Sequence, residues 1–577
     1  MPDPRIHVEP ERLDDLPLAL GLLRQMRVPQ IVDAHLGAGH GNRQGLSYGE
    51  LTHGFAGRIM TARDHRLSPV EAWTHDHQET LSRLLGVSVG DKDFTDDRLA
   101  DLVYALGHAS PEVREDIETD LGQHLVRAYR LPTAVGRADT TSISVYHERA
   151  EGADGLLQFG KSKDRRPDLR QYLQALGTLD PAGIPLVSET LDGNASDPPT
   201  YLPVWRRLVK VIGHTDWLFV GDSKLHSAQN IAEIHRAQGL LLTPLQMNGH
   251  MPEHFAEWLR QKPKHLKTLA LPDANGSQRR VGHGYEVTHT LTWNDPQRGE
   301  TMTVPLRVFM VRRESFKEKQ IHDLHRRLER AEVALQALNG RRGDTPTARD
   351  ALEAQVQALL TEHQVAEYIS VQVQWREQAL EKYVGPGRPG PDRRKQTLTY
   401  HVAHVSRRRK PAVIQAYEDA AGWRAYATNA PTTRLTLQQA VEKYAGQWQP
   451  ERGFGRLKGG WLKVAPIFLR TDEHIRGLMF ILSIVLRVFT LVEFVVRREL
   501  QERQETLTGL YDGAPRKTTD HPTAERLLDA FEDITLLQIR VGQTVQYQLS
   551  GFSKLHRHIL QLLGLPASLY MGLENSS

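Results

Sequence analysis

Short apolar runs, interrupted by two amphipathic segments, fill residues 131–243 and restrict the possible folds more than any other part of the chain. They predict a sheet covered by helices, in which three neighbouring strands are followed by a helix, a strand, a helix and a strand. The predicted strands are Arg137–Tyr146, Tyr172–Leu179, Pro185–Thr190, Trp217–Gly221 and Gly239–Thr243. The predicted helices are Tyr201–Val211 and Ser227–Gln238. This region therefore belongs to the α/β class.

Two aspartates stand on the strands of this region, and a third carboxylate lies far downstream. Asp139 falls on the first predicted strand, and Asp222 follows the fourth. Tyr444, Glu451 and Lys458 recur at steps of seven in a segment predicted to be one helix, which places them along one helical face. Three carboxylates on two strands and a helix can hold two divalent cations through oxygen ligands, so the pattern predicts a two-ion Mg²⁺ site, with Mn²⁺ as an alternative.

These motifs resemble the DDE transposases of bacterial insertion sequences. The superfamily in question, the insertion sequence four-like one, carries the signature Tyr-x2-Arg-x3-Glu-x6-Lys, and the overall layout is similar to its sixteen-thirty-four branch. Tyr444, Glu451 and Lys458 fall in register with the signature, whereas Gln447 stands at the arginine position. The aspartate motifs match as Asp139-Thr-Thr and Gly-Asp222, over a resemblance spanning roughly residues 130–500. Further family-like pieces are Asp192-Gly-Asn194 with Asp197, and Ala427-Thr-Asn429.

The resemblance implies an RNase H-like catalytic core in which Asp139, Asp222 and Glu451 are both the catalytic residues and the metal ligands. It implies Mg²⁺-dependent cleavage and strand transfer of double-stranded DNA, acting on terminal inverted repeats and on target DNA in cut-and-paste transposition. Because paired ends must be cut together, a homodimer in a paired-end complex is expected. The expected location is the bacterial cytoplasm, in association with the nucleoid.

The resemblance also implies DNA contacts around the carboxylates. Tyr444 and Lys458 are expected to bind phosphates of the transferred end. Gln447 donates a hydrogen bond but has no charge, so it cannot form the bidentate phosphate clamp of an arginine. Arg452 or Arg456 is the expected compensation. Trp293 is a candidate for holding a flipped base, against the plainer alternative that it is a packing residue.

The long spacing between Asp222 and Glu451 predicts an insertion in the core. Tyr285–Trp293 and Met302–Val311 alternate as a β-hairpin does, and a heptad stripe from Ile321 to Leu338 precedes a second helix, which predicts an antiparallel helical hairpin. Gly385–Lys395 has the composition of a linker, with a minor-groove DNA segment as the alternative. Thr397–Val405 and Trp423–Thr428 are predicted as strands that return to the core.

Five regions follow from these patterns. They are an N-terminal helical, DNA-end-binding domain (1–130), the first part of the core (131–270), the β-rich and helical-hairpin insertion (271–396), the second part of the core with the glutamate-bearing helix (397–500) and a C-terminal region (501–577). In the first region, Ser47 with Glu50 and Ser68 with Glu71 have the spacing of capping boxes and predict two helix starts. A dimerisation or packing role is the alternative to DNA binding there.

The amino-acid composition and charge of the chain exclude some kinds of site and partner. The absence of cysteine excludes disulfides and thiolate zinc sites. The net charge of +3 gives only a weak indication of a polyanionic partner. The apolar stretch Leu478–Val496 contains Arg487 and Glu493, so it predicts a buried core helix and no membrane partner. Two alternatives remain beside the transposase: a metal-dependent endonuclease without strand transfer, and a DNA-binding or assembly protein with an inactive core.

Overall fold

Two compact units make up the chain in the computed structural model, which describes residues 6–37, 45–146, 155–273, 276–388, 390–511 and 513–574. Unit 1 comprises Met1–Gln246, His289–Arg307 and Ala427–Ser577. Unit 2 comprises Met247–Thr288 and Val308–Tyr426. The unit boundaries differ from the predicted insertion at 271–396, because the chain first leaves unit 1 after Gln246 and returns to it for the last time at Ala427.

Unit 1 is a mixed α/β structure built on a large mixed sheet. Its first strands are β2 (Val135–Ser144), β3 (Gln171–Leu179), β4 (Ile184–Asp192), β5 (Leu218–Val220) and β6 (Leu240–Pro244). Their order is β4-β3-β2-β5-β6, in which β2, β3 and β4 are antiparallel neighbours while β5 and β6 run parallel to β2. All five predicted strands are confirmed. The strands β12 (Trp423–Thr428), β9 (Glu300–Arg313) and β8 (Gln278–Asp295) follow β6 in the strand order and continue into unit 2.

Helices cover this sheet as the periodicity predicted. The predicted segments form α8 (Pro198–Ile212) and α9 (Ala228–Arg236). Gly177 of β3 allows α8 to approach closely, because an added Cβ would lie 2.8 Å from a methyl group of Val204. Helix α8 ends at Gly213, whose φ of 87° suits glycine at a helix C-terminus.

Seven helices precede the sheet in the part of the chain that the structure describes. They are α1 (Leu16–Gln25), α2 (Val28–Leu36), α3 (Tyr48–Ala62), α4 (Val70–Asp76), α5 (Gln78–Leu85), α6 (Asp96–His108) and α7 (Pro111–Ala128). The predicted capping box at the start of α3 is confirmed, since Ser47 and Glu50 exchange hydrogen bonds of 3.1 and 2.8 Å. The predicted cap at Ser68 is wrong, because α4 begins only after Pro69 and makes no side-chain capping bond.

The long helix α16 (Asp472–Arg503) is the centre of unit 1. Its apolar window has a mean hydropathy of 2.3 and is entirely buried within the fold, as predicted for a core helix. The two interrupting charges are paired: Arg487 donates to Glu118 at 2.9 Å, and Glu493 accepts from Arg456 at 2.6 Å. Helix α6 crosses α16 at Gly477, where an added Cβ would stand 1.8 Å from a backbone carbonyl of α6.

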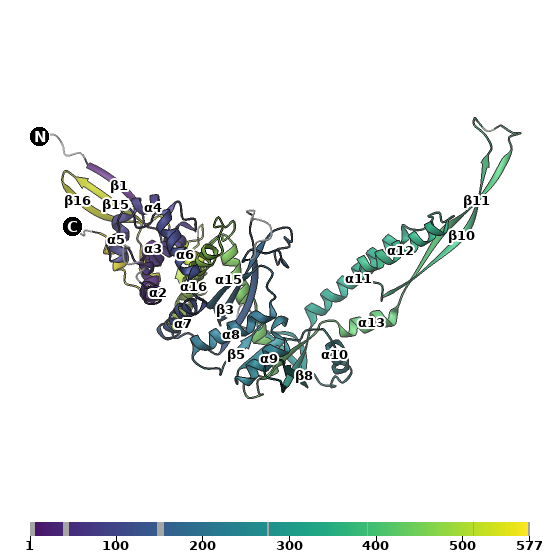
Figure 1. The fold of residues 1–577 in the computed structure, drawn as a ribbon, viewed down its shortest axis with the longest axis horizontal. Coiled ribbons are helices and arrows are strands. Elements are labelled where there is room, and N and C mark those ends of the chain that lie inside the picture. Colours follow the sequence, from purple (N-terminus) through teal and green to yellow (C-terminus); the bar gives the residue numbers. More distant parts are fainter. Residues whose placement is uncertain are drawn as a thin grey trace. The chain divides into compact units, whose positions relative to one another are not determined.

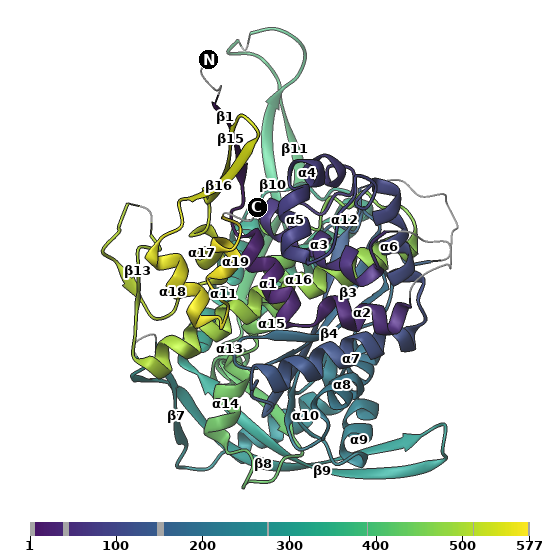
Figure 2. The same ribbon diagram turned by 90° about the vertical axis from the view of Figure 1, so that its left-hand side faces the viewer.

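The two ends of unit 1 share a sheet that the sequence did not indicate. Strand β1 (Ile6–Arg12) pairs antiparallel with β15 (Thr535–Val541), which pairs with β16 (Thr544–Ser550) (Figure 2). The N-terminal and C-terminal regions therefore belong to one compact unit, whereas the sequence predicts regions that end at 130 and begin at 501. The remaining elements here are β13 (Leu507–Thr508), β14 (Thr518–Thr519), α17 (Ala524–Asp529), α18 (Lys554–Leu562) and α19 (Ser568–Met571). Residues 1–5 of the polar N-terminal segment lie outside the described residues.

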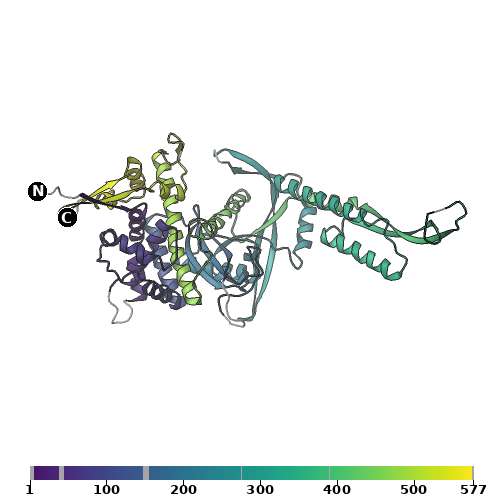
Figure 3. The ribbon, with the colours of Figure 1, turned by 90° about the horizontal axis from the view of Figure 1, so that it is seen from above.

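Unit 2 contains the predicted helical hairpin. Its elements, apart from the shared strands, are α10 (Met251–Arg260), β7 (Lys267–Pro272), α11 (Glu314–Gln336), α12 (Pro346–Glu362), β10 (Ile369–Tyr383), β11 (Lys395–Arg409) and α13 (Pro411–Ala420). Helices α11 and α12 lie side by side (Figure 3). The leucines of the heptad stripe are buried between them: Leu324, Leu328 and Leu335 of α11 pack with Leu352 and Val356 of α12.

One prediction for this unit is wrong. Thr397–Val405 lies in β11, which pairs with β10 in a separate two-stranded sheet and does not return to the core. The predicted linker Gly385–Lys395 connects β10 to β11, and Pro389 within it lies outside the described residues.

Candidate active site

Asp139 and Asp222 stand at the same level on adjacent parallel strands. The register pairs Arg137 of β2 with Val220 of β5, and each aspartate lies two residues beyond its member of that pair. Because neighbouring strands are about 4.8 Å apart, this register brings the two carboxylates to one edge of the sheet. Asp139 is still on β2, whereas Asp222 follows β5 and precedes the short helix η1 (Ser223–Leu225).

The environment of Asp139 places it near both other predicted carboxylates. Burial raises the pKa of Asp139 to about 6, against the lowering effects of the Lys163 charge and of the hydrogen bond from the Thr140 amide, while the charges of Asp222 and Glu451 raise it further. The Thr140 amide donates to Asp139 Oδ1 at 2.8 Å. Side chains from β2, from the end of β5 and from α15 (Trp448–Lys458) therefore share one electrostatic environment.

Asp222 is held by two donors. The hydroxyl of Tyr201 on α8 donates to its Oδ1 at 2.6 Å, and the backbone amide of Lys224 donates to the same oxygen at 2.8 Å. Burial, together with the negative charges of Asp222 and Asp139, raises the pKa of Tyr201 well above its ordinary value. Tyr201 therefore remains a hydrogen-bond donor to Asp222. Sequence reasoning had assigned it only to a helix, because its partner lies on a different element.

Glu451 reaches the site from a shorter helix than predicted. Tyr444 lies on α14 (Leu437–Ala445), whereas Glu451 and Lys458 lie on α15, so the prediction of one continuous helix is wrong. Pro450 explains the break. In one continuous helix its ring would clash with the carbonyl group of Gly446, and it has no amide hydrogen to donate to that carbonyl. Helix α15 packs across β2, and Glu451 is exposed in its first turn.

The three predicted side chains are of the type that binds a divalent cation, although they do not converge closely enough to coordinate one. All three groups are carboxylates, the ligands that Mg²⁺ prefers, and two of them raise the pKa of the third. Among the described residues, no group of three or more His, Asp or Glu side chains is arranged closely enough to hold an ion.

A lysine that sequence reasoning did not select lies beside Asp139. Lys163 donates to the carbonyl oxygen and the hydroxyl of Thr140, at 2.6 and 2.5 Å, and lies 3.7 Å from Asp197. The Thr140 hydroxyl in turn donates to Asp197 at 2.7 Å. Asp197 thus holds the strand next to Asp139. No motif marks Lys163, which precedes β3 in an irregular segment.

Gln447 contacts an arginine from another element. Its Oε1 accepts from Nη1 of Arg137 at 3.3 Å, and its Nε2 is buried with no hydrogen-bond partner among the described residues. Arg137 is fully buried, and it also donates to Asp180 at 2.6 and 2.8 Å and to the carbonyl of Lys443 at 2.6 Å. A guanidinium group therefore lies beside the signature's arginine position, but it comes from β2 and faces the interior.

The two arginines expected to compensate for Gln447 form ion pairs within unit 1. Arg452 and Arg456 both donate to the buried carboxylate of Glu493 on α16, each with a bond of 2.6 Å, and Arg456 also donates to Glu525 at 2.7 Å. Only 6% of Arg456 is exposed, whereas the side chain of Arg452 is 30% exposed. Both groups neutralise a carboxylate in the core of unit 1, and their role in DNA binding stays a prediction.

The other predicted DNA contacts occupy varied environments. Lys458 forms an ion pair with Asp164 at 2.7 Å, and the half-buried Tyr444 lies on α14. Trp293 of β8 lies beneath the guanidinium of Arg236, 5.6 Å from its ring centroid. Asn429 joins β12 to β6, since its side chain accepts from the Leu241 amide at 2.9 Å.

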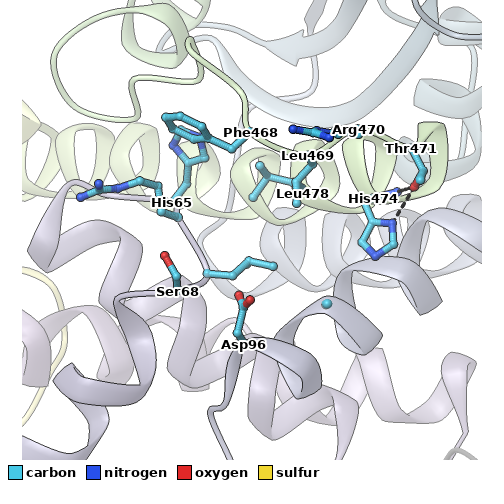
Figure 4. Close-up of a pocket in the computed structure, with 12 residues that line it drawn as sticks. His65, Ser68, Asp96, Phe468, Leu469, Arg470, Thr471, His474 and Leu478 are labelled. Carbon is cyan, nitrogen blue, oxygen red and sulfur yellow. Dashed lines mark hydrogen bonds between the residues drawn. The ribbon is translucent and has the colours of Figure 1, made fainter. Parts of the chain in front are cut away.

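A separate cavity of about 590 Å³ lies at the start of α16 (Figure 4). Phe468, Leu469 and Arg470 form one wall, while Ser68, from the segment before α4, and Asp96, from the start of α6, face them. None of the three predicted carboxylates lines this cavity, so it is not the carboxylate site.

Comparison with known proteins assigns no role to any residue of the chain. No family model matches it, and no curated protein matches it. Among solved structures, a similar chain comes from the cryo-EM structure of a piggyBac transposase synaptic complex with hairpin DNA, with a TM-score of 0.23 and 13% identity. The match covers 54% of this chain and 61% of that one, and a similarity of this degree carries no argument about fold or activity.

Proposed function

We propose that this protein is a DDE-type DNA transposase with an RNase H-like core, in which Asp139, Asp222 and Glu451 form the catalytic site. The observation that carries the proposal is the convergence of three carboxylates from β2, the end of β5 and α15, seen in the influence of Asp222 and Glu451 on the pKa of Asp139. The strand order β4-β3-β2-β5-β6, with an antiparallel triplet and a parallel pair, is the arrangement expected of such a core.

The proposed cofactor is Mg²⁺, held by Asp139, Asp222 and Glu451. When bound, it supplies activation of a water or 3′-hydroxyl nucleophile and stabilisation of the leaving oxygen. Tyr201 and the Lys224 amide orient Asp222 by donating to one of its oxygens, and the Thr140 amide does the same for Asp139. These bonds position the carboxylates before substrate arrives, which limits the reorganisation needed during reaction.

Lys458 is the proposed phosphate-binding cation of the site. Its ion pair with Asp164 is exchanged for a phosphate of the transferred end, which has the same charge as the carboxylate it replaces. Tyr444 is the proposed second phosphate contact. The proposed partners are terminal inverted repeats and target DNA, bound by a homodimer in the bacterial cytoplasm.

A metal-dependent endonuclease without strand transfer is the second candidate. The observation that favours it is the neutral Gln447, which contacts Arg137 and leaves the site without the charged clamp expected to hold a transferred end. An assay for joining of a 3′-hydroxyl end to a second duplex separates the two candidates.

The first test uses purified protein, Mg²⁺ and a labelled duplex that carries the terminal repeat flanking the gene. Asp222→Asn keeps the shape of the side chain and removes a ligand charge. Asp216→Asn is the matched control, because Asp216 is an exposed carboxylate six residues earlier whose ion pair is with Arg434. Cleavage at the repeat boundary by wild type and by the control, but not by Asp222→Asn, supports the proposal. Equal cleavage by all three proteins refutes it.

A further inference from the structure

The β10–β11 ribbon of unit 2 has one face covered by helices only at its base. Trp375, Val373 and Val405 pack against the hydrophobic core of α11 and α12. Beyond residue 376, every residue of β10 is exposed. The distal half of the ribbon is therefore a two-stranded arm with both faces open to solvent (Figure 1).

The register assigns each residue of the ribbon to one of two faces. Ile369 pairs with Arg409, and the pairing continues without interruption to Tyr383 and Lys395. Directly opposed residues of an antiparallel pair share a face, and successive residues alternate. The odd-numbered residues thus lie on the face that contacts the helices. The even-numbered residues, 370–382 on β10 and 396–408 on β11, form what we call the open face.

Carboxylates are confined to one face of the ribbon. The open face carries Arg376, Lys382 and Arg408, and it has no carboxylate among the strand residues that the structure describes. The opposite face holds both glutamates, Glu377 and Glu381, and its own three cations are engaged: Lys395 with Glu381, Arg409 with Glu332 and Arg407 with Gln336. The three cations of the open face form no ion pair within the described part of the chain. The open face is therefore positively charged over its whole length.

Most of the remaining side chains of the open face are hydrogen-bonding or aromatic groups: Ser370, Gln372, Gln374, Gln378, Gln396, Tyr400, His404 and Ser406. Leu380 and Leu398 are exposed apolar residues of the same face, whereas Val402, which pairs with Arg342, is only 8% exposed. Arg342, from the turn between α11 and α12, stacks 4.3 Å above the ring of Tyr400 and adds a fourth cation. Glutamine and arginine are the side chains that read adenine and guanine edges in duplex DNA.

The tip of the ribbon is organised by Arg393. Its guanidinium donates to the carbonyl oxygens of Val384 at 3.1 Å, Pro386 at 2.7 Å and Gly387 at 2.5 Å. The Arg393 side chain is therefore engaged in the hydrogen bonds of the turn. Arg388 and Arg394, in contrast, have no ion pair or side-chain hydrogen bond in the described part of the structure. The turn thus presents two arginines beyond the end of the strands.

We propose that the open face of the β10–β11 ribbon binds double-stranded DNA by entering the major groove, with Arg388 and Arg394 contacting backbone phosphates at the tip. A two-stranded ribbon fits the B-form major groove, which is about 12 Å wide. Four cations without a carboxylate on one face complement the phosphate rows on either side. The inference rests on the proposed function in so far as that function supplies DNA as the partner.

The experiment compares two double variants of the full chain that change net charge equally on opposite faces of the same strands. Arg376→Gln/Lys382→Gln removes two charges from the open face. Thr397→Glu/Thr399→Glu adds two negative charges to the opposite face and is the matched control. Affinity for a fluorescent duplex is measured by anisotropy over a range of salt concentrations, with Asp222→Asn as a further binding control.

The open-face variant is expected to bind about tenfold more weakly at low salt, and its slope of log K against log salt is expected to fall by about 2, since each lost phosphate contact removes about 0.9. The control variant is expected to bind within about twofold of wild type. Equal weakening of both variants, or of neither, overturns the inference.

Two further outcomes also overturn it. An A-form RNA duplex has a major groove too narrow for a ribbon, so competition by RNA as strong as that by DNA excludes groove binding. A loss of self-association in the open-face variant, with unchanged DNA affinity, identifies a second copy of the chain as the occupant. Normal cleavage with unchanged binding in the open-face variant counts against the ribbon alone, whereas face-dependent binding without cleavage counts against the proposed catalytic function alone.

Discussion

Replacing Asp139 with asparagine is expected to stabilise the metal-free protein at neutral pH, although it removes a proposed catalytic carboxylate. Burial, with the charges of Asp222 and Glu451, raises the pKa of Asp139 to about 6 from an ordinary value of 3.8. At about 1.4 kcal/mol for each pH unit of difference, ionising this group in the folded protein costs about 3 kcal/mol.

The sign of the pH dependence follows from the raised pKa. Between about pH 4 and pH 6 the folded protein holds a proton that the unfolded chain has released, so the contribution of Asp139 to stability falls as pH rises through this window. Above pH 6 the full cost is present. The asparagine side chain of the Asp139→Asn variant has no charge to desolvate, and its oxygen can still accept the amide hydrogen bond of Thr140 that Asp139 accepts at 2.8 Å.

Urea unfolding of unit 1, followed by tryptophan fluorescence in EDTA, tests this reasoning. At pH 8, Asp139→Asn is expected to be more stable than wild type by about 2–3 kcal/mol, and at pH 4.5 by only about 1 kcal/mol. Asp101→Asn, at an exposed position of α6, is the control and is expected to show no such trend. A difference that does not vary with pH, or a variant less stable than wild type at pH 8, would refute the argument. Added Mg²⁺ is expected to stabilise wild type and not the variant.

Three further substitutions test the packing around the site. Gln447→Arg completes the family signature but sets a second guanidinium beside the buried Arg137, so we expect a loss of roughly 2 kcal/mol in stability and no gain in cleavage, measured by urea unfolding and by the duplex assay. Glu493→Ala leaves three arginine partners without their buried carboxylate and is expected to cost roughly 3–5 kcal/mol, read from the same unfolding curves. Gly477→Ala forces a Cβ against the backbone of α6 and is expected to lower the thermal midpoint by several degrees, whereas Gly460→Ala, with open space around it, is expected to leave the midpoint unchanged.

Local patterns in the sequence predicted much of the core. Apolar runs marked the five strands, and the position of Asp139 on β2 and of Asp222 at the end of β5 followed from them, because strand period and strand end are properties of a few consecutive residues. The buried heptad positions of α11 and α12 were predicted for the same reason. Side-chain pairing across the fold was not predictable in this way. Arg137 lies in β2, and its partners at 180, 443 and 447 are distant in sequence.

The errors have related physical causes. The helix break between Tyr444 and Glu451 was missed because a spacing of seven fits two helices as well as one when the intervening turn is short. Strand β1 was missed because its short alternation, Ile6-His-Val8-Glu-Pro10, contains a proline and lies in a polar segment, and because its partner β15 is more than 500 residues away. Arg452 and Arg456 were assigned to DNA because the acid that neutralises them is on another helix, 37 residues or more away.

The pairing of β1 with β15 also determines when unit 1 can be completed during synthesis. Ile6 leaves the ribosome about 535 residues before its partner Val541. At elongation rates of about 5–20 residues per second, β1 waits roughly half a minute to two minutes for its neighbour. During this interval its hydrogen-bonding edge is unpaired and open to chaperones or to other chains. Only chains translated past residue 541 can complete this sheet. A prematurely terminated product therefore lacks the pairing of β1 with β15, even when Asp139, Asp222 and Glu451 are all present.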